Sequence, residues 1–229
     1  MKKVLITGAS GAIGRSISEY FVNMGYIVFA GYCKNKPEIS GAKSIYIDVC
    51  DKLSVENAIK EIGGVDILVN NAGISQQKLF LDIEEDDWDR MFSVNIKGMY
   101  NVTKAVLPHM INNKSGRIIN ISSIWGEIGG SMEVHYSATK AAVIVFTKAL
   151  AKELSLSGIT VNCVSPGMII SPMNGHLEAE DIKEIEAEIP LKRQGTPEEV
   201  AKGVYFFASN MSDYITGQVL SISGGWNIS

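Results

Sequence analysis

Short apolar runs alternate along the chain with longer segments in which apolar residues recur every three to four positions. Runs of the first kind are typical of strands, and segments of the second kind are typical of amphipathic helices. The pattern predicts strands at about 3–7, 26–31, 44–48, 66–69, 117–121, 159–163 and 218–221. It predicts helices at about 12–24, 52–61, 86–112, 134–157 and 197–208. Strands that alternate with helices indicate βαβ units and a parallel sheet.

Several of the predicted strands are apolar on both faces. Residues 65–69 read Val-Asp-Ile-Leu-Val and residues 117–121 read Arg-Ile-Ile-Asn-Ile, with little alternation. A strand that is buried on both faces lies between two layers of helices. The predicted fold class is therefore α/β, a doubly wound parallel sheet with helices on both faces. No repeat or linker divides residues 1–229, so we expect a single domain.

One segment, at about 172–195, differs from the rest of the chain. It is acidic, helical in pattern, and ends in Pro-Leu-Lys-Arg-Gln-Gly. The segment follows the end of a predicted strand, which is where α/β sheets bind their ligands. We therefore expect a mobile flap over a binding site.

Charge and composition narrow the possible partners. The formal net charge of -4 provides no general positive field for phosphate backbones, so we expect no nucleic-acid partner. No apolar stretch approaches the roughly 18 residues of a membrane helix, and the N-terminus does not resemble a signal peptide. We expect a cytoplasmic protein without a membrane partner. Cys33, Cys50 and Cys163 lack the spacing of a zinc site or a disulfide framework, so no metal is expected.

A glycine-rich turn follows the first predicted strand. Thr7 leads into Gly8-Ala-Ser-Gly-Ala-Ile-Gly14, after which a helical pattern begins. Glycines let a backbone approach a pyrophosphate closely, and a helix N-terminus supplies N–H groups and a positive dipole. The position between a strand and a helix predicts a dinucleotide site, a Rossmann fold, with a plain tight turn as the alternative. The expected cofactor contacts in this turn are Gly8, Ser10, Gly11, Ala12, Ile13 and Gly14.

The end of the second strand bears on the choice of cofactor. A site built for NAD carries a carboxylate there, whereas this chain has Tyr32, Cys33 and Lys34. Lys34 can pair with the 2′-phosphate of NADP, with a solvated loop lysine as the alternative. We take Tyr32 and Lys34 as cofactor contacts, and the pattern favours NADP(H) over NAD(H).

A tyrosine and a lysine are the candidates for proton transfer. Tyr136 and Lys140 lie four residues apart in a predicted helix and so share one face. A phenol has a pKa of about 10, and a nearby cation favours its ionised form. Considered alone, the pair also fits an ordinary core tyrosine and a surface lysine. Ser123 after a strand and Asn95 within the long helix can both present hydrogen-bonding groups at the carboxyl edge of the sheet.

Together these motifs resemble the short-chain dehydrogenase/reductase family over essentially the whole chain. The residues that carry the resemblance are Thr7 to Gly14, Asn70-Asn71-Ala72-Gly73, Asn95, Ser123, Tyr136-x-x-x-Lys140 and Pro166-Gly167, in the order of the family. Gly11 departs from many NADP-using relatives, which have a basic residue there, and this leaves the choice between NADP and NAD open. Within the family the chain looks most like the 3-oxoacyl-[acyl-carrier-protein] reductases, through residues 214–218 and 223–225.

The resemblance implies an NAD(P)-dependent oxidoreductase that interconverts a carbonyl and an alcohol. It implies that Tyr136 donates a proton to the carbonyl oxygen and that Ser123 hydrogen-bonds this oxygen. Lys140 would hold the nicotinamide ribose and lower the tyrosine pKa, and Asn95 would position a water that links Lys140 to solvent. Besides Tyr136 and Lys140, the implied cofactor contacts are Asp48, Val49, Asn71, Ala72, Gly73, Pro166, Gly167, Ile169 and Ser171.

The substrate stays open between alternatives. The resemblance implies a 3-oxoacyl thioester or a similar ketone, a role in fatty acid biosynthesis, and a homotetramer. For a carrier protein, Lys114 is a candidate docking residue, but Ser157 stands where carrier-protein reductases tend to have arginine. Residues 122–135, with Trp125 and Glu133, also resemble reductases of an aminopentanone modification on elongation factor P. A non-catalytic dinucleotide sensor is the alternative of another class, and the presence of Tyr136 and Lys140 argues against it.

Overall fold

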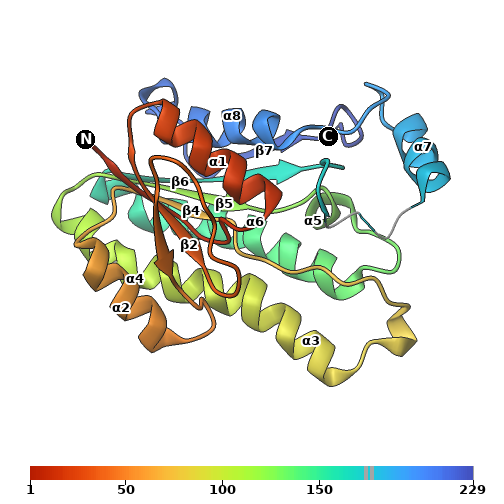
Figure 1. The fold of residues 1–229 in the computed structure, drawn as a ribbon, viewed down its shortest axis with the longest axis horizontal. Coiled ribbons are helices and arrows are strands. Elements are labelled where there is room, and N and C mark those ends of the chain that lie inside the picture. The colour runs from red at the N-terminus through yellow and green to blue at the C-terminus, as the bar shows by residue number, and fades with distance from the viewer. Residues whose placement is uncertain (173–174, 176–177, 229) are drawn as a thin grey trace.

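The computed structural model describes residues 1–172, 175 and 178–228, which form one parallel sheet between two helical layers (Figure 1). The strands of the described residues are β1 (Lys3–Ile6), β2 (Ile27–Tyr32), β3 (Lys43–Tyr46), β4 (Ile67–Asn70), β5 (Gly116–Ile121), β6 (Ile159–Pro166) and β7 (Val219–Ile222). They lie in the order β3-β2-β1-β4-β5-β6-β7, and every neighbouring pair is parallel. The predicted fold class and the predicted strands are confirmed, with shifts at their ends.

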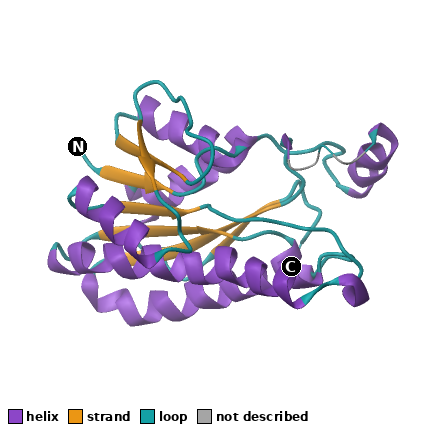
Figure 2. Ribbon diagram, turned by 60° about the horizontal axis from the view of Figure 1, so that its bottom comes forward, coloured by secondary structure: helices purple, strands orange, loops and turns teal. Residues whose placement is uncertain are grey.

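Helices cover both faces of the sheet, as the uninterrupted apolar strands predict (Figure 2). The α-helices are α1 (Ala12–Asn23), α2 (Lys52–Ile62), α3 (Glu85–Phe92), α4 (Met99–Asn112), α5 (Trp125–Ile128), α6 (Val134–Leu154), α7 (Ala179–Glu188) and α8 (Pro197–Ala208). Phe21 of α1 and Val204 of α8 belong to one apolar core, and Val55, Val106 and Leu154 of the opposite helices belong to the other. The sheet therefore separates two hydrophobic cores.

The long helix predicted at 86–112 is interrupted. A π-helical segment, Ser93–Gly98, joins α3 to α4, and it carries Asn95. The sequence pattern did not predict this segment, because one inserted residue changes the apolar periodicity too little to be recognised. The short helix α5 was also missed, since it spans only Trp125–Ile128.

The expected flap is partly described. Residues 173, 174, 176 and 177 lie outside the described part, whereas α7 confirms the helical pattern of the segment. At its base, Ile169 pairs with Gly195, with Gly195 N–H donating to Met168 O at 2.9 Å and Ile170 N–H donating to Gly195 O at 2.9 Å. The two ends of the segment are thus joined, and its mobility stays a prediction.

The connection from β2 to β3 is a parallel crossover that lacks the usual helix. Residues 33–42, all of which the structure describes, contain no helix, as the sequence pattern predicted. Side chains of the first βα unit fasten this loop: Ser10 Oγ donates to Asn35 O, and Arg15 Nη1 donates to Glu38 O at 3.0 Å. Ile39 is buried and takes part in the core under α1. Polar anchors and the buried side chains of Pro37 and Ile39 therefore replace the packing of a crossover helix.

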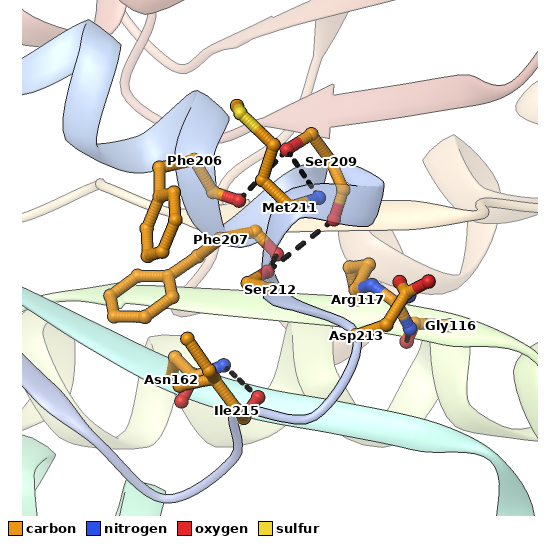
Figure 3. A network of polar contacts seen from close by, with 10 residues as sticks. All are labelled: Gly116, Arg117, Asn162, Phe206, Phe207, Ser209, Met211, Ser212, Asp213 and Ile215. Carbon is orange, nitrogen blue, oxygen red and sulfur yellow. Dashed lines mark hydrogen bonds and ion pairs between the residues drawn. The ribbon is translucent and has the colours of Figure 1, made fainter.

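Polar contacts also fix the turn between α8 and β7 (Figure 3). Ser212 Oγ donates to Phe207 O at 3.0 Å, and Arg117 Nη2 donates to Asp213 Oδ1 at 2.5 Å. Asn162 Nδ2 donates to Ile215 O at 2.9 Å, so this turn is tied to β6 as well.

No helix of the described residues has the length and apolar character needed to cross a membrane.

A row of buried amides and hydroxyls crosses the middle of the sheet onto the helices. Asn70 Nδ2 donates to Thr103 Oγ1 at 3.0 Å and to Asn120 Oδ1 at 2.8 Å. Asn120 Nδ2 in turn donates to Thr147 Oγ1 at 2.9 Å. Because these groups are cut off from water, each hydrogen bond offsets a desolvation cost.

We predict that Asn120→Ala lowers the free energy of unfolding by about 1–3 kcal/mol, because it removes partners from Asn70 and Thr147 inside the core. The measurement is a urea titration monitored by circular dichroism. Asn113→Ala, at an exposed position, is the control and should change stability by less than about 0.5 kcal/mol. Equal effects of the two substitutions would contradict the stabilising role of the buried row.

Candidate functional site

The topology changes direction between β1 and β4, and the candidate site lies at the carboxyl ends of these strands. The chain moves outward from β1 to β2 and β3, then returns to β4 on the other side of β1. Crossover loops on the two sides diverge at such a point and leave a crevice in which α/β proteins bind ligands. The glycine-rich turn after β1 and residues 71–73 after β4 both border this point.

The glycines of the turn have different steric roles. Gly8 has a φ of 67°, and a Cβ there would lie 2.8 Å from Ala72 Cα. A Cβ on Gly14 would lie 2.4 Å from Gly8 O, whereas a Cβ on Gly11 would meet its nearest neighbour, Gly8 O, at 3.6 Å. Gly8 and Gly14 are therefore required by the packing of the turn itself. Gly11 is not, so any constraint on it comes from outside the protein.

Thr7 connects the turn to the segment after β4. Its Oγ1 accepts hydrogen bonds from Asn71 N–H and Ala72 N–H, both at 3.0 Å. Asn71 Nδ2 donates to Thr7 O at 3.0 Å and to Gly8 O at 3.1 Å. The predicted contacts Gly8, Asn71 and Ala72 are thus brought together. Thr7 was not predicted as a site residue, although its place directly before the first glycine was a usable signal.

The N-terminus of α1 suits an anion. The described residues place no side-chain cap and no acidic residue on its first turn, and the predicted contacts Ser10 and Gly11 before it are exposed. Free N–H groups at a helix N-terminus bind phosphate, because they point outward and carry positive partial charge. Ala12 and Ile13 belong to this turn, so the geometry fits the pyrophosphate of a dinucleotide.

The predicted adenosine contacts surround the ends of β2 and β3. Tyr32 packs edge-on against Tyr46, with the ring centroids 5.9 Å apart, and Lys34 is exposed in the following loop. Asp48 Oδ1 accepts from Cys50 N–H at 2.9 Å, so this carboxylate also closes a local turn. Val49 is buried. These residues share one end of the crevice.

The predicted nicotinamide contacts lie at the end of β6. Pro166 O accepts from Ile124 N–H at 3.0 Å, and Gly167 N–H donates to Ile222 O at 2.9 Å. Ile169 is buried and Ser171 is half-buried at the base of the flap segment. A cavity of about 320 Å³ lies beside them, and its lining includes Met168, Leu191, Gly195 and Ser223.

Tyr136 and Ser123 face each other at the carboxyl end of β5. Burial raises the pKa of Tyr136 to about 12, although a side-chain hydrogen bond with Ser123 lowers it. The charge of Glu133 raises it further. In this structure the removal of the phenolate from water outweighs the favourable hydrogen bond. The lowering of the tyrosine pKa by Lys140 together with a bound, oxidised nicotinamide ring stays a prediction.

Lys140 also lies at the carboxyl end of β5. Its Nζ donates to Ile121 O at 2.9 Å and lies 5.6 Å from the centre of the Tyr136 ring. Only 6% of the residue is exposed, and burial lowers its pKa to about 8. The predicted pairing of Tyr136 and Lys140 on one helix face is confirmed. The anchoring carbonyl of Ile121 was missed, because a backbone acceptor leaves no mark in a sequence.

Asn95 is positioned by the π-helical segment rather than by a regular helix. Its Oδ1 accepts from Ile74 N–H at 2.9 Å, and its Nδ2 donates to Ile74 O and to Thr139 Oγ1, both at 3.0 Å. At Gly73, the position of a Cβ would lie 3.3 Å from Asn95 Oδ1 and 3.5 Å from Lys140 Nζ. A side chain at position 73 would therefore crowd the polar atoms of both Asn95 and Lys140.

Thr139 is a further residue of the site that the sequence did not reveal. It is buried, binds Asn95, and donates through Oγ1 to Tyr136 O at 2.8 Å. A threonine in a helix is common, so only the position three residues after Tyr136 could have indicated this role.

Among the described residues, no group of three or more His, Cys, Asp or Glu side chains is arranged to hold a metal ion.

Comparison with known proteins places the chain among reductases. A family profile described as "Enoyl-(Acyl carrier protein) reductase" matches residues 8–227. The 3-oxoacyl-[acyl-carrier-protein] reductase FabG of Thermotoga maritima is 41% identical over 98% of this chain and 97% of its own length. Nodulation protein G of Rhizobium meliloti is 38% identical over 98% of this chain and 96% of its own. The crystal structure of a 3-oxoacyl-[acyl-carrier protein] reductase from Brucella melitensis superposes with a TM-score of 0.95 at 34% identity, covering 100% of this chain and 92% of that one.

We predict that Lys140→Met stabilises the fold at pH 7 by about 1–3 kcal/mol, because it removes a buried ammonium whose pKa is lowered in the folded state. The penalty acts in full below the folded-state pKa of about 8. It falls as the pH rises from about 8 to the unfolded value of about 10.4 and is gone above that value, where lysine is neutral in both states. Urea titrations of both proteins from pH 7 to pH 10 test this, and a variant less stable than the natural protein at pH 7 would contradict it.

Proposed function

The chain belongs to the short-chain dehydrogenase/reductase family, and on this premise we propose that it reduces a 3-oxoacyl thioester, or a similar ketone, with NADPH. That it is an oxidoreductase acting on a carbonyl or hydroxyl group follows from the family and from its reductase relatives. The observation that carries the finer proposal is the joint placement of Tyr136, Ser123 and Lys140 at one sheet edge. A non-catalytic dinucleotide sensor would have no use for this arrangement.

Tyr136 acts as the proton donor in this proposal. With a pKa of about 12, its phenol is protonated at neutral pH, which is the form that reduction of a carbonyl requires. Ser123 hydrogen-bonds the substrate oxygen and keeps it beside the phenol. A bound nicotinamide supplies the hydride, while the protein orients the carbonyl and provides the matched proton.

Lys140 and Asn95 return the proton to Tyr136. The ammonium of Lys140 stabilises the tyrosinate left after donation and holds the nicotinamide ribose. Asn95 Oδ1 and Lys140 Nζ both lie beside the backbone of Gly73. In this proposal Asn95 positions a water that connects Lys140 to solvent.

NADPH is preferred because Lys34, exposed after β2, pairs with its 2′-phosphate. The N-terminus of α1 would hold the pyrophosphate, and Asp48 with the segment Asn71 to Gly73 would hold the adenosine part. Pro166, Gly167, Ile169 and Ser171 would hold the nicotinamide. We also propose that the flap segment 172–195 closes over the substrate.

Whether a carrier protein delivers the substrate is a separate question. Lys114 and Ser157 precede β5 and β6, so they lie at the amino edge of the sheet, opposite the edge that carries Tyr136. Within one chain they are remote from the proposed mouth of the site. A free thioester is therefore the appropriate first substrate, because it needs no docking surface.

A ketone that bears an amine, such as the aminopentanone on elongation factor P, is the second candidate. The observation that favours it is Glu133, which is only 8% exposed and acts electrostatically on Tyr136. A carboxylate so close to the proton donor suits a cationic substrate. Reduction of a short aminoketone, compared with the same ketone lacking the amine, distinguishes this candidate from the first.

We further propose a homotetramer in the cytoplasm. Tyr100 of α4 and Val145 of α6 are 45% and 64% exposed, on helices that also pack against the sheet. Apolar residues on a second helix face suit symmetric contacts between copies of the chain.

We predict that Tyr136→Phe lowers kcat for NADPH-dependent reduction of a short 3-oxoacyl thioester by about a hundredfold to ten-thousandfold, because it removes the proton donor. Affinity for NADPH, measured by fluorescence titration, should stay within about twofold, since the aromatic ring remains. Tyr214→Phe, at an exposed position before β7 and away from the carboxyl edge of the sheet, is the matched control. Turnover by Tyr136→Phe near the natural rate would refute the mechanism, and no thioester reduction by the natural protein would refute the substrate.

We predict that Lys34→Ala lowers kcat/KM for NADPH about tenfold to a hundredfold and leaves that for NADH nearly unchanged, since it removes a charged partner of the 2′-phosphate. Lys36→Ala in the same exposed loop is the control. Initial rates with both cofactors measure the ratio. A similar loss with both cofactors would show that Lys34 does not read the phosphate.

A further inference from the structure

The helix turn that carries Tyr136 is held by a chain of side chains to which the proposed reaction gives no role. His135, directly before Tyr136, is fully buried, and its Nε2 lies 3.1 Å from Gln76 Oε1. Gln76 Nε2 donates to Asp87 Oδ1 at 3.0 Å, and Lys78 Nζ donates to Asp87 Oδ2 at 2.5 Å. The chain therefore joins α6, the segment after β4, and α3.

The direction of each hydrogen bond follows from the carboxylate. Hydrogen bonds from Lys78 and then Gln76 lower the pKa of Asp87 to about 2, so it is ionised and only accepts. Gln76 must turn its NH₂ toward Asp87 and its carbonyl toward His135. His135 then carries a proton on Nε2, and burial lowers its pKa, which favours the neutral ring. Its Nδ1 is a buried acceptor without a partner among the described residues.

The same segment supports a strained backbone next to Tyr136. Met132 has a φ of 61°, a backbone region that favours glycine and strains a residue with a side chain. Lys78 N–H donates to Met132 O at 2.8 Å, so one residue braces the loop with its backbone and Asp87 with its side chain. Strain of this kind persists only where the surroundings enforce it.

The other end of the segment is also anchored beside the site. Ile74 exchanges two hydrogen bonds with the Asn95 side chain, and Asn95 binds Thr139. The segment therefore contacts α6 through His135 and, by way of Asn95, through Thr139. These two contacts lie on either side of Tyr136 along the helix.

We propose that His135, Gln76, Asp87 and Lys78 form a positioning network that fixes the first turn of α6 and thereby the direction of the Tyr136 hydroxyl. None of the four touches the reacting atoms, so each acts through Tyr136. The inference rests on the proposed function, because it is the proton donated by Tyr136 that needs this orientation.

The first test is independent of any substrate. It uses NMR spectra of protein labelled with ¹⁵N-histidine, in which the chain gives signals from only three histidines. The signal that is lost in His135→Gln is that of His135. We expect the neutral, Nε2-protonated form at pH 7. Asp87→Asn frees Gln76 to rotate and should shift His135 toward Nδ1 protonation. A cationic or Nδ1-protonated His135 in the natural protein would overturn the network, and so would an Asp87→Asn variant with an unchanged signal.

The second test is kinetic and uses conservative rescue. His135→Met should lower kcat about tenfold to a hundredfold with the KM for NADPH nearly unchanged, whereas His135→Gln, which keeps a donor near Nε2, should recover most of the rate. Combined with Gln76→Met, His135→Met should cause little further loss. An unchanged kcat in His135→Met, or fully additive losses, would overturn the proposal. If no thioester is reduced, the proposed substrate fails, and the same comparison is made with any ketone that the natural protein turns over.

Discussion

The seven parallel strands of the described residues bring their carboxyl ends to one edge of the sheet, and the positions of the candidate site's side chains depend on this constraint. The glycine-rich turn follows β1, Asn71 follows β4, Ser123 follows β5 and Gly167 follows β6. Segments far apart in the chain therefore meet because the strands before them are parallel neighbours in one sheet. What remains for individual residues is the local adjustment of distance and charge.

Two sets of hydrogen bonds make this adjustment. Thr7 and Asn71 exchange side-chain and backbone hydrogen bonds, which fixes the glycine-rich turn against the neighbouring strand end. Lys140 donates to Ile121 O, which fixes α6 against the end of β5. In both cases a side chain binds backbone atoms, and backbone atoms of a sheet move little. The candidate site is thus attached by hydrogen bonds to the sheet, which is the most rigid part of the fold.

The sequence predicted those parts of the protein that depend on repeated patterns. Uninterrupted apolar strands indicated a sheet covered on both faces, and the order of Asn95, Ser123, Tyr136 and Lys140 predicted a candidate site whose side chains the fold brings together. It did not predict the π-helical turn around Asn95, because one extra residue in a helix barely alters periodicity. Nor did it indicate the link from His135 to Gln76, since a contact between residues 59 positions apart depends on tertiary packing. Nor could the spacing of Tyr136 and Lys140 indicate how far burial raises the tyrosine pKa, because burial also depends on tertiary packing.

Burial shifts the pKa values of Tyr136 and Lys140 in opposite directions. In the proposed reaction this favours transfer of a proton from Lys140 to the tyrosinate. Burial raises the pKa of Tyr136 to about 12 and lowers that of Lys140 to about 8, since it opposes a charge on either group. If Tyr136 donates its proton as proposed, a tyrosinate is left near an ammonium, and each charge offsets the desolvation of the other. In the proposed reaction, the shifts that keep Tyr136 protonated beforehand therefore do not oppose the charged pair that follows. This balance depends on keeping the two groups close and correctly oriented, which is why contacts that fix α6 on both sides of Tyr136 matter to the chemistry.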